Sequence, residues 1–314
     1  MKIAIMGSGG VGGLFGTHLV RGGADVTFIA RGTHLDAMRR DGIRIEGAPG
    51  GDMHVQQVQA TDDPASIGPV DLVLFAVKLG ATQAAIDAIR PLVGPDTAVV
   101  SFQNGVLKDD YLKEAFGEDR VFGGVGYVGS AIDRPGVIRQ SGPMQRLVFG
   151  EFDGRRSARV EAFLAACEAA GSFTAEIADD IRRATWEKFV FLTGLSGTTA
   201  TMRVPIGPIR SNPQTRAFLH DVMHEVVTVG RAHRVDLPEN YAEIRLELAD
   251  DVAPAMTSSL HHDLQRGNPL EVPWLAGGVV ELGRQAGVPT PLNRAIADIL
   301  ALYVDGTPTE AAGP

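Results

Sequence analysis

The first residues whose types and spacing could do chemistry form a glycine-rich turn near the start of the chain. Residues 7–12 follow the pattern Gly-x-Gly-x-x-Gly, with an apolar, strand-like run before them and a helical pattern after them. In a strand–turn–helix unit the first glycine allows the turn, the second lets the backbone approach a pyrophosphate, and the third lets helix and strand pack closely. Free N–H groups at the helix N-terminus then favour the phosphates. A plain glycine-rich turn is the alternative. The predicted dinucleotide site consists of Gly7, Ser8, Gly9, Gly10, Val11 and Gly12.

A basic residue follows the second predicted strand, at 25–30. In Rossmann-type dinucleotide-binding folds the residue just past that strand faces the adenosine ribose. An acidic side chain there would bind the 2′-hydroxyl of NAD, whereas an arginine can pair with the 2′-phosphate of NADP. The position holds Arg31, and neither Asp nor Glu occupies the strand end. We therefore predict NADPH/NADP+ as the cofactor, against the alternative of a solvated loop arginine.

Polar side chains also stand at the ends of two further predicted strands. The apolar run at 69–78 is typical of a strand buried on both faces of a parallel sheet, and it ends in Lys78. The run at 98–102 leads into an Asn-Gly turn at Asn104. Because ligands of open α/β sheets bind beyond the carboxyl ends of strands, Lys78 and Asn104 are candidate ligand contacts. A solvated lysine and a simple turn are the alternatives, and a turn is compatible with binding.

A lysine interrupts an apolar stripe in the second half of the chain. Helical spacing places this stripe on one face of the helix predicted at 180–200. Lys188 either extends its ammonium group to the rim of the helix or serves chemistry, and the residues alone favour the rim. The stripe contains Ile181, Thr185, Lys188, Leu192, Leu195 and Ser196.

A second polar stretch lies at 257–272. Two serines, the second being Ser259, precede an amphipathic turn, and Glu271 is predicted to open the next helix, where it could simply favour the helix dipole. His261 and His262 are adjacent, so they point apart on a helix. No histidine spacing suits a metal, and we predict no metal site. Gly-x-Ser-x-Gly is absent, so a hydrolase nucleophile elbow is unsupported.

Two kinds of scaffold must position these residues. Up to residue 180, predicted strands alternate with helices, and a β-rich pair lies at 121–129 and 137–150. The expected fold is α/β: a Rossmann-type dinucleotide-binding domain (1–179), then an all-α domain (180–304). The tail, 305–314, lacks core residues and is predicted to be disordered. Beyond residue 180 helices are expected near 180–200, 213–234, 238–265, 269–287 and 291–303.

Composition excludes several classes of protein. The chain has 314 residues, of which 44% are hydrophobic, enough for two ordinary cores. The net charge of −9 argues against a nucleic-acid partner. The single cysteine, Cys167, permits no intrachain disulfide and is expected to be a core residue rather than a reactive thiol. The glycine turn comes too early for a signal peptide, and no apolar run reaches about 18 residues, so we expect a cytoplasmic protein without a membrane partner.

Taken together, these features resemble the ketopantoate reductase (2-dehydropantoate 2-reductase) family, the NADPH-dependent enzymes of pantothenate synthesis. The likeness spans residues 1–304 and rests on separated marks that occur in the family's order. The marks are the glycine turn, Arg31, Val77-Lys78, Gln103-Asn104-Gly105, Trp186-Glu187-Lys188, Thr257-Ser258-Ser259, Glu271 and Gly287-Val288-Pro289.

The resemblance implies where the cofactor binds. Residues 7–12 would hold its pyrophosphate and Arg31 its 2′-phosphate. Lys78 and Asn104 would border both cofactor and substrate, and Glu271 would reach the nicotinamide end.

The resemblance also implies the chemistry. Lys188 would be the proton donor, because a lysine ammonium aimed at a ketone oxygen stabilises the developing charge and supplies a proton. Asn104 and Ser259 would bind the substrate. The partner implied is a small-molecule 2-oxo acid, and a homodimer is left open as the assembly.

Four positions depart from the family. Where the family has asparagines four and eight residues after the lysine, this chain has Leu192 and Ser196, and two further family asparagines align with Ile206 and Met256. Leu192 and Ser196 share the helical face of Lys188, so we expect both to line the substrate pocket. The pocket should be more apolar than the family's, and it has lost several hydrogen-bonding groups that discriminate substrates.

Three functions therefore stay open. The first is NADPH-dependent reduction of a 2-oxo acid, with ketopantoate favoured. The second is a paralogue that acts on a different, less polar carbonyl or alcohol. The third is a cofactor-binding sensor without turnover, against which Lys188 and Glu271 argue, because a sensor needs no proton donor.

Overall fold

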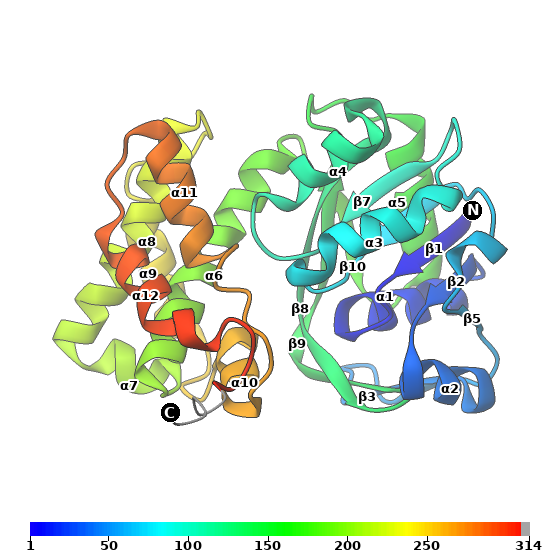
Figure 1. The fold of residues 1–314 in the computed structure, drawn as a ribbon, viewed down its shortest axis with the longest axis horizontal. Helices are drawn as coiled ribbons and strands as arrows, with labels where there is room; N and C mark the ends of the chain where they lie inside the picture. The colour runs from blue at the N-terminus through cyan, green and yellow to red at the C-terminus, as the bar shows by residue number, and fades with distance from the viewer. Residues whose placement is uncertain (309–314) are drawn as a thin grey trace, which may run out of the picture. The chain divides into compact units, whose positions relative to one another are not determined.

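The chain divides into two compact units in a computed structural model that describes residues 1–308 (Figure 1). The first unit contains Met1–Asn104 and Lys108–Ala184, and the second contains Gly105–Leu107 and the chain from Thr185 onward. The chain thus leaves the first unit for three residues and returns to it at Lys108. It passes into the second unit for good between Ala184 and Thr185, within a helix.

A ten-stranded mixed sheet forms the centre of the first unit. Its order is β4-β3-β9-β8-β7-β6-β1-β2-β5, with β10 also paired to β9. All pairings from β5 to β8 along this path are parallel, whereas β8 and β9 form a long antiparallel hairpin. The strands are β1 (Lys2–Met6), β2 (Asp25–Ile29), β3 (Ile43–Glu46), β4 (Met53–Val55), β5 (Gln59–Thr61), β6 (Leu72–Phe75), β7 (Ala98–Ser101), β8 (Val121–Arg134), β9 (Val137–Gly150) and β10 (Thr174–Ile177).

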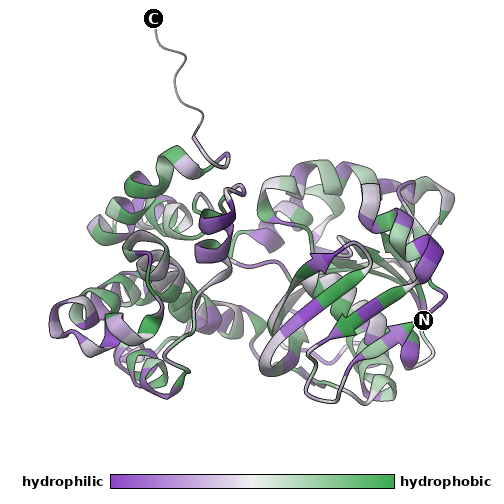
Figure 2. Ribbon diagram, turned by 90° about the horizontal axis from the view of Figure 1, so that it is seen from below, coloured by the Kyte–Doolittle hydropathy of each residue, from purple (hydrophilic) through white to green (hydrophobic). Residues whose placement is uncertain are grey.

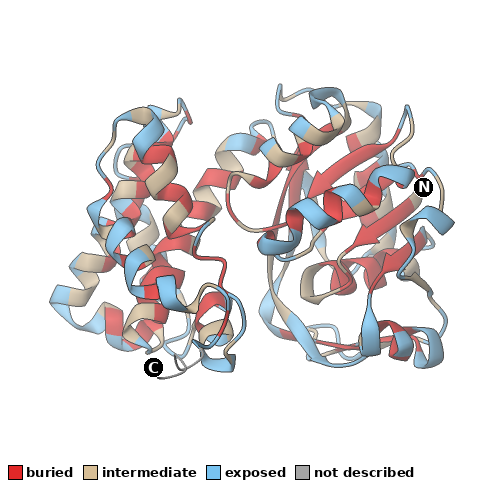
Figure 3. Cartoon of the chain, viewed as in Figure 1, coloured by how far each residue is buried: buried red, intermediate tan, exposed pale blue. Residues whose placement is uncertain are grey.

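Helices cover both faces of the parallel strands, which explains their continuous apolar sequences. In β1, Ile3 and Ile5 pack into one core cluster while Ala4 and Met6 pack into another, because successive side chains of a strand point to opposite faces. The first cluster is filled by helices α1 (Gly10–Arg21), α2 (Gly32–Asp41) and α5 (Ala158–Ala170), and the second by α3 (Thr82–Ile89) and α4 (Lys108–Phe116). Figure 3 shows these strands as mostly buried. The α/β expectation is confirmed.

Cys167 lies on the buried face of α5. Its side chain is fully buried, and burial raises the pKa of its thiol to about 12. A thiol with so high a pKa carries almost no thiolate near neutral pH, so the expectation of a core residue is confirmed.

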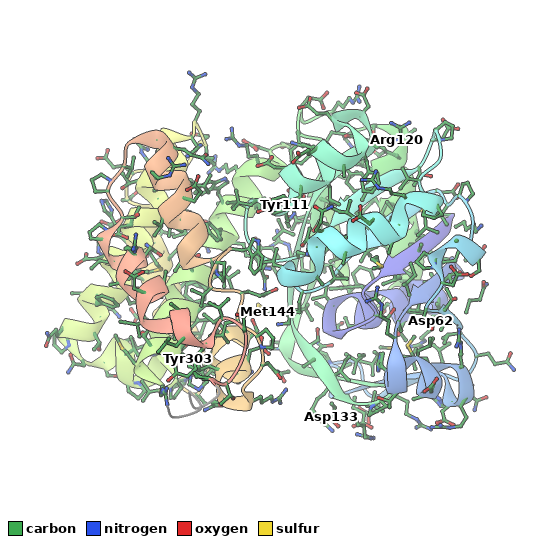
Figure 4. The ribbon with its side chains drawn as sticks, in the orientation of Figure 1. Asp62, Tyr111, Arg120, Asp133, Met144 and Tyr303 are labelled. Atoms are coloured by element: carbon green, nitrogen blue, oxygen red, sulfur yellow. The ribbon has the colours of Figure 1, made fainter. Side chains whose placement is uncertain are left out.

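The β8–β9 hairpin extends five residues further along β8 than predicted. The end of the hairpin carries Asp133 (Figure 4), which accepts hydrogen bonds from Arg134 at 2.7 Å and from Arg139 at 3.0 Å. Both arginines also pair with Glu46 of β3. This exposed network supplies charge partners that the strand pattern alone does not reveal.

Helices make up the second unit. Each carries both hydrophobic and hydrophilic residues, as amphipathic helices around a core do (Figure 2). Among the described residues no helix combines the length and apolar character needed to cross a membrane. The helices are α6 (Ile181–Met202), α7 (Ile206–Ser211), α8 (Pro213–Ala232), α9 (Tyr241–Asp251), α10 (Ser259–Arg266), α11 (Ala276–Ala286) and α12 (Pro291–Leu300).

The helix predicted at 238–265 is two helices. After α9 the backbone becomes extended at Val252, and Pro254 lies in the connecting segment. The N-cap of α10 is Ser258, whose Oγ accepts a hydrogen bond from the His261 amide at 3.1 Å. The prediction was wrong because apolar residues on both sides of the break face cores of the same unit and continue the helical pattern.

The helix predicted at 269–287 starts later than expected. Helix α11 begins at Ala276, after an irregular segment that contains Pro269 and a turn that contains Pro273. Glu271 therefore does not open a helix, and its role stays a prediction. Its side chain is nonetheless buried, with 8% of its surface exposed. The short helix α7 is an element that the sequence analysis did not anticipate.

Part of the predicted disordered tail is folded against α10. The amide of Thr307 donates to the carbonyl of Gly267 at 3.2 Å, and Gly306 is buried beside that same carbonyl. The prediction of disorder from residue 305 therefore fails for 305–308, because backbone hydrogen bonds can anchor a segment without core side chains. Residues 309–314 lie outside the described residues.

His18 is a buried histidine of α1. Its ring is 1% exposed, its Nδ1 bonds the Ser172 hydroxyl, and its Nε2 has no partner among the described residues. Burial, with Arg21 adding a smaller effect, lowers the pKa of His18 from 6.5 to about 4. The folded chain therefore resists a proton that the unfolded chain accepts below pH 6.5.

We expect His18 to destabilise the protein as the pH falls from about 6.5 to about 4, by about 3 kcal/mol in total. Chemical unfolding measured across this range checks the prediction. His18→Leu removes the titration and keeps the apolar packing, so its unfolding free energy should vary less with pH. If the unfolding free energy of His18→Leu varied with pH as steeply as that of the wild type, His18 would not be the group responsible.

Candidate functional site

The last residues of four neighbouring parallel strands lie in one row. Met6 of β1 pairs with Ile29 of β2 and with Phe75 of β6, and Phe75 pairs with Ser101 of β7. The chain segments that follow this row carry the glycine turn, Arg31, Lys78 and Asn104. The sheet register therefore brings all the first-unit candidates to one edge, the carboxyl edge, where open α/β sheets bind ligands.

The three motif glycines meet three different steric demands. Gly7 has φ +97°, and a Cβ there would come within 2.7 Å of the Val77 amide nitrogen. A Cβ at Gly12 would lie 2.3 Å from the Gly7 carbonyl oxygen, so this glycine allows helix and strand to pack closely. A Cβ at Gly9 would meet nothing within 4 Å. The middle glycine thus faces open space, as close approach of a pyrophosphate requires.

The N-terminus of α1 suits an anion. Gly9 is its N-cap, no side chain caps this end, and its first turn contains no acidic residue. The first N–H groups of a helix have no partner within the helix, and the helix dipole adds positive potential there. The glycine turn can therefore hold phosphate oxygens with its backbone.

Arg31 and His34 lie in the segment that follows β2, and His34 contacts this turn. Arg31 is exposed and forms the N-cap of α2. The Nδ1 of His34 accepts a hydrogen bond from the Gly136 amide at 3.1 Å, so its Nε2 donates to the Ser8 carbonyl oxygen at 2.9 Å. Burial lowers the pKa of His34, which favours this neutral form. His34 thus holds the glycine turn against α2, a contact that sequence reasoning missed because no local pattern predicts it.

Lys78 and Asn104 extend from the ends of β6 and β7. Lys78 is exposed and immediately precedes a short 3₁₀-helix (Leu79–Ala81), while Asn104 is half-buried. Both lie beyond the strand-end row, where a ligand at the carboxyl edge can be contacted. Their roles as ligand contacts remain predictions.

In the second unit, helix α6 presents Lys188, Leu192 and Ser196 at successive turns of one face. Lys188 and Leu192 are half-buried, and Ser196 is 1% exposed. The Oγ of Ser196 has no hydrogen-bond partner among the described residues. A buried hydroxyl without a partner costs free energy, so a polar group that binds there would be favoured.

Other residues of α6 hold the helix in the unit. A Cβ at Gly194 would lie 2.5 Å from the Met223 side chain, and one at Gly197 would lie 2.8 Å from Ile296. These glycines therefore let α8 and α12 pack closely against α6. Trp186 and Phe189 add an edge-to-face ring pair to the core.

Helix α10 contacts α6 near the C-terminal end of α6. The hydroxyl groups of Thr199 and Ser258 lie 3.0 Å apart, and the Nδ1 of His261 donates to the Thr199 carbonyl oxygen at 2.7 Å. Ser258 thus caps α10, whereas its neighbour Ser259 is exposed. Since Thr199 is three residues after Ser196, Ser259 starts α10 near the far end of the Lys188, Leu192 and Ser196 face.

The other two positions that align with family asparagines, Ile206 and Met256, lie side by side. The Ile206 amide donates to the Met256 carbonyl oxygen at 2.9 Å. Ile206 is fully buried in the core of the second unit, and Met256 packs against the same core. An apolar side chain at position 206 therefore serves packing and offers a substrate no hydrogen bond.

The fold and the glycine turn define a Rossmann-type dinucleotide-binding protein with a helical second unit. A family model described as ketopantoate reductase PanE/ApbA matches residues 3–154, and the model of that family's C-terminal part matches residues 180–304. The chain therefore belongs to the ketopantoate reductase family. Members of this family are NADP-dependent oxidoreductases that act on CH–OH groups.

Individual relatives match over nearly their whole lengths. A 2-dehydropantoate 2-reductase of Mesorhizobium japonicum is 32% identical over 94% of this chain and 95% of the relative. An uncharacterized oxidoreductase, YkpB of Bacillus subtilis, is 28% identical over 96% and 99%. The crystal structure of a PanE/ApbA family ketopantoate reductase from Ralstonia eutropha is 34% identical, with a TM-score of 0.88 over 97% of this chain and 98% of that one.

Proposed function

We propose that this protein reduces 2-dehydropantoate (ketopantoate), a 2-oxo acid, to pantoate with NADPH, and that Lys188 donates the proton. The observation that carries the proposal is the α6 face that combines Lys188 with the buried Ser196, whose hydroxyl finds no hydrogen-bond partner within residues 1–308. A relative named 2-dehydropantoate 2-reductase, similar over nearly the whole chain, supports the substrate.

Residues of the first unit fit the cofactor. The open space at Gly9 and the uncapped N-terminus of α1 would receive the pyrophosphate, and Arg31 would pair with the 2′-phosphate. Lys78 and Asn104, at the same sheet edge, would contact the cofactor further along. Glu271, which belongs to the second unit, is proposed to reach the nicotinamide end.

The chemistry asked of the protein is a proton transfer. When bound, NADPH supplies a hydride to the ketone carbon. The ketone oxygen then gains negative charge, which the Lys188 ammonium stabilises as it donates a proton from Nζ to that oxygen. The product is the alcohol, and Lys188 regains its proton from solvent. Asn104 and Ser259 hold the substrate in place, while Ser196 offers its hydroxyl to a polar substrate group.

A second candidate is a paralogous reductase of a less polar carbonyl compound. The observation that favours it is the apolar character of Leu192 and Ile206, where the family has asparagines. Such a site would lose the hydrogen bonds that select a hydroxylated substrate.

NADPH consumption across a panel of 2-oxo acids tests both candidates. We expect ketopantoate to give the highest kcat/KM. A 2-oxo acid without the hydroxyl group that gives a higher kcat/KM would favour the paralogue instead. No turnover of any 2-oxo acid would contradict the first candidate. If less polar ketones and aldehydes are added to the panel and are not reduced either, both candidates are contradicted and a sensor is favoured.

Leu192 provides a test of substrate selection. We expect Leu192→Asn, alone or with Ser196→Asn, to raise kcat/KM for ketopantoate relative to 2-oxo acids that lack its hydroxyl. A hydrogen bond of about 0.5–1.5 kcal/mol would make this ratio change by roughly threefold to tenfold. The measurement is the ratio of kcat/KM values for the two kinds of substrate.

Two controls accompany that test. Leu248→Asn alters an exposed leucine of α9 in the same unit and should leave the ratio unchanged. Thermal unfolding of each variant shows whether the asparagine is buried without a partner, which would destabilise the unit. A folded Leu192→Asn variant with wild-type specificity would show that this face does not select the substrate.

A further inference from the structure

Gln103 is a buried amide that joins the ends of two strands. It follows β7, and 6% of its surface is exposed. Its Nε2 donates to the Val77 carbonyl oxygen at 3.0 Å and to the Thr82 hydroxyl at 2.9 Å, and its Oε1 accepts from the Ser101 hydroxyl at 3.1 Å. Both N–H groups and the oxygen of the amide are therefore satisfied.

These bonds reach the immediate neighbours of both candidate ligand contacts. Val77 directly precedes Lys78, and Gln103 directly precedes Asn104. The regular ladder between β6 and β7 ends near the bond from the Phe102 amide to the Phe75 carbonyl oxygen. Beyond the ladder, the Gln103 side chain continues the connection between the two segments.

Lys108 lies at the end of the loop that follows β7 and contains Gln103 and Asn104. Its side chain is 1% exposed, and its Nζ donates to the Ser101 carbonyl oxygen at 3.0 Å and to the Asp109 carboxylate at 2.8 Å. The chain leaves the first unit after Asn104 and rejoins it at Lys108. Ser101 thus binds both sides of this excursion, Gln103 through its hydroxyl and Lys108 through its carbonyl group.

We propose that Gln103, Ser101 and Lys108 form a positioning network that sets the places of Lys78 and Asn104 for cofactor binding. The proposal rests on the proposed function, which puts those two side chains against NADPH. The three residues act through the backbone of their neighbours and need no contact with the cofactor. A buried network whose groups are all satisfied is rigid, and displacement of a binding group by 1 Å can cost about 10²-fold in rate.

Gln103→Met tests the network, because methionine has a similar length and lacks the amide. We expect the Kd for NADPH, measured by cofactor fluorescence, to rise about tenfold. In a Lys78→Ala, Asn104→Ala background the same change should have little further effect on that Kd, because Gln103 acts through those residues. A purely structural role would give equal effects in both backgrounds.

Glu151→Gln is the matched control. Glu151 is 4% exposed and accepts two hydrogen bonds from the Arg159 guanidinium group, each at 2.6 Å. It follows β9, whose end pairs with the beginning of β8, so it lies at the amino edge of the parallel strands. This variant should lower the unfolding temperature and leave the Kd for NADPH unchanged. Should Gln103→Met fail to fold, Ser101→Ala removes the hydroxyl that donates to Gln103, keeps the carbonyl group that binds Lys108, and is expected to raise the Kd by roughly threefold to tenfold.

The outcomes separate this proposal from the proposed function. If Lys78→Ala and Asn104→Ala leave NADPH binding unchanged, the placement of the cofactor is wrong and the network proposal falls with it. If those variants weaken binding while folded Gln103→Met and Ser101→Ala stay within about twofold of wild type, only the positioning network is overturned.

Discussion

Lys188→Ala is expected to lower kcat by about 10²–10⁴-fold and to leave the Kd for NADPH nearly unchanged. The reason is that the proposed role of the ammonium group is at the ketone oxygen, where it would stabilise charge and supply a proton, and not at the phosphates. Alanine is a good helix former, so α6 should persist. Steady-state turnover and cofactor binding, measured on the same preparation, check the split between the two effects.

Arg182→Ala is the control for this prediction. Arg182 is an exposed basic residue of the same helix, so its loss changes the net charge equally without touching the α6 face of Lys188. Turnover by Lys188→Ala within a few-fold of wild type would mean that Lys188 only extends to the helix rim.

Arg31→Ala is expected to raise the KM for NADPH by about tenfold to hundredfold, the range expected from losing a charged hydrogen bond of about 1.5–3 kcal/mol. The KM for NADH should change far less, because only NADPH carries the 2′-phosphate. The cofactor preference, expressed as the ratio of the two kcat/KM values, is the measurement.

Arg40→Ala controls for a general loss of positive charge. Arg40 is an exposed arginine of α2 that pairs with Asp41 and lies away from the N-cap. It should leave the preference for NADPH intact. Equal changes with both cofactors in Arg31→Ala would refute the pairing of Arg31 with the 2′-phosphate.

Sequence patterns predicted the first unit well, because its elements have strong local signals. The apolar runs of β1, β6 and β7 are bounded by glycine, lysine and polar turns, and the Pro135-Gly136 pair marks the β8–β9 hairpin. The glycine motif encodes its own stereochemistry, so the structural roles of Gly7 and Gly12 follow from spacing alone.

The second unit was predicted less accurately, since helical periodicity alone does not mark helix ends. Ala249 and Leu260 are both buried, so the apolar pattern continues across the break between α9 and α10. Pro254 and the capping serine were the available signals. Proline at 273 likewise marks the late start of α11, which moves Glu271 out of the helix.

The positioning contacts were beyond the reach of sequence patterns. Gln103 bonds residues 21 and 26 positions away, and His34 accepts from a residue 102 positions away. Such long-range hydrogen bonds depend on how strands are ordered in the sheet, which a single sequence does not specify. An Asn-Gly turn signal explains Asn104 but carries no information about the buried amide before it.

The central claim is that the protein reduces ketopantoate with NADPH, and an isotope measurement tests it most directly. Ketopantoate is incubated with the protein and NADPH that carries deuterium at C4, with each of the two labelled diastereomers in turn, and the pantoate formed is analysed by mass spectrometry and NMR. We predict that one diastereomer gives pantoate with deuterium at C2 and that the other gives unlabelled pantoate. Failure to form pantoate, or pantoate without deuterium at C2 from either diastereomer, would contradict the account.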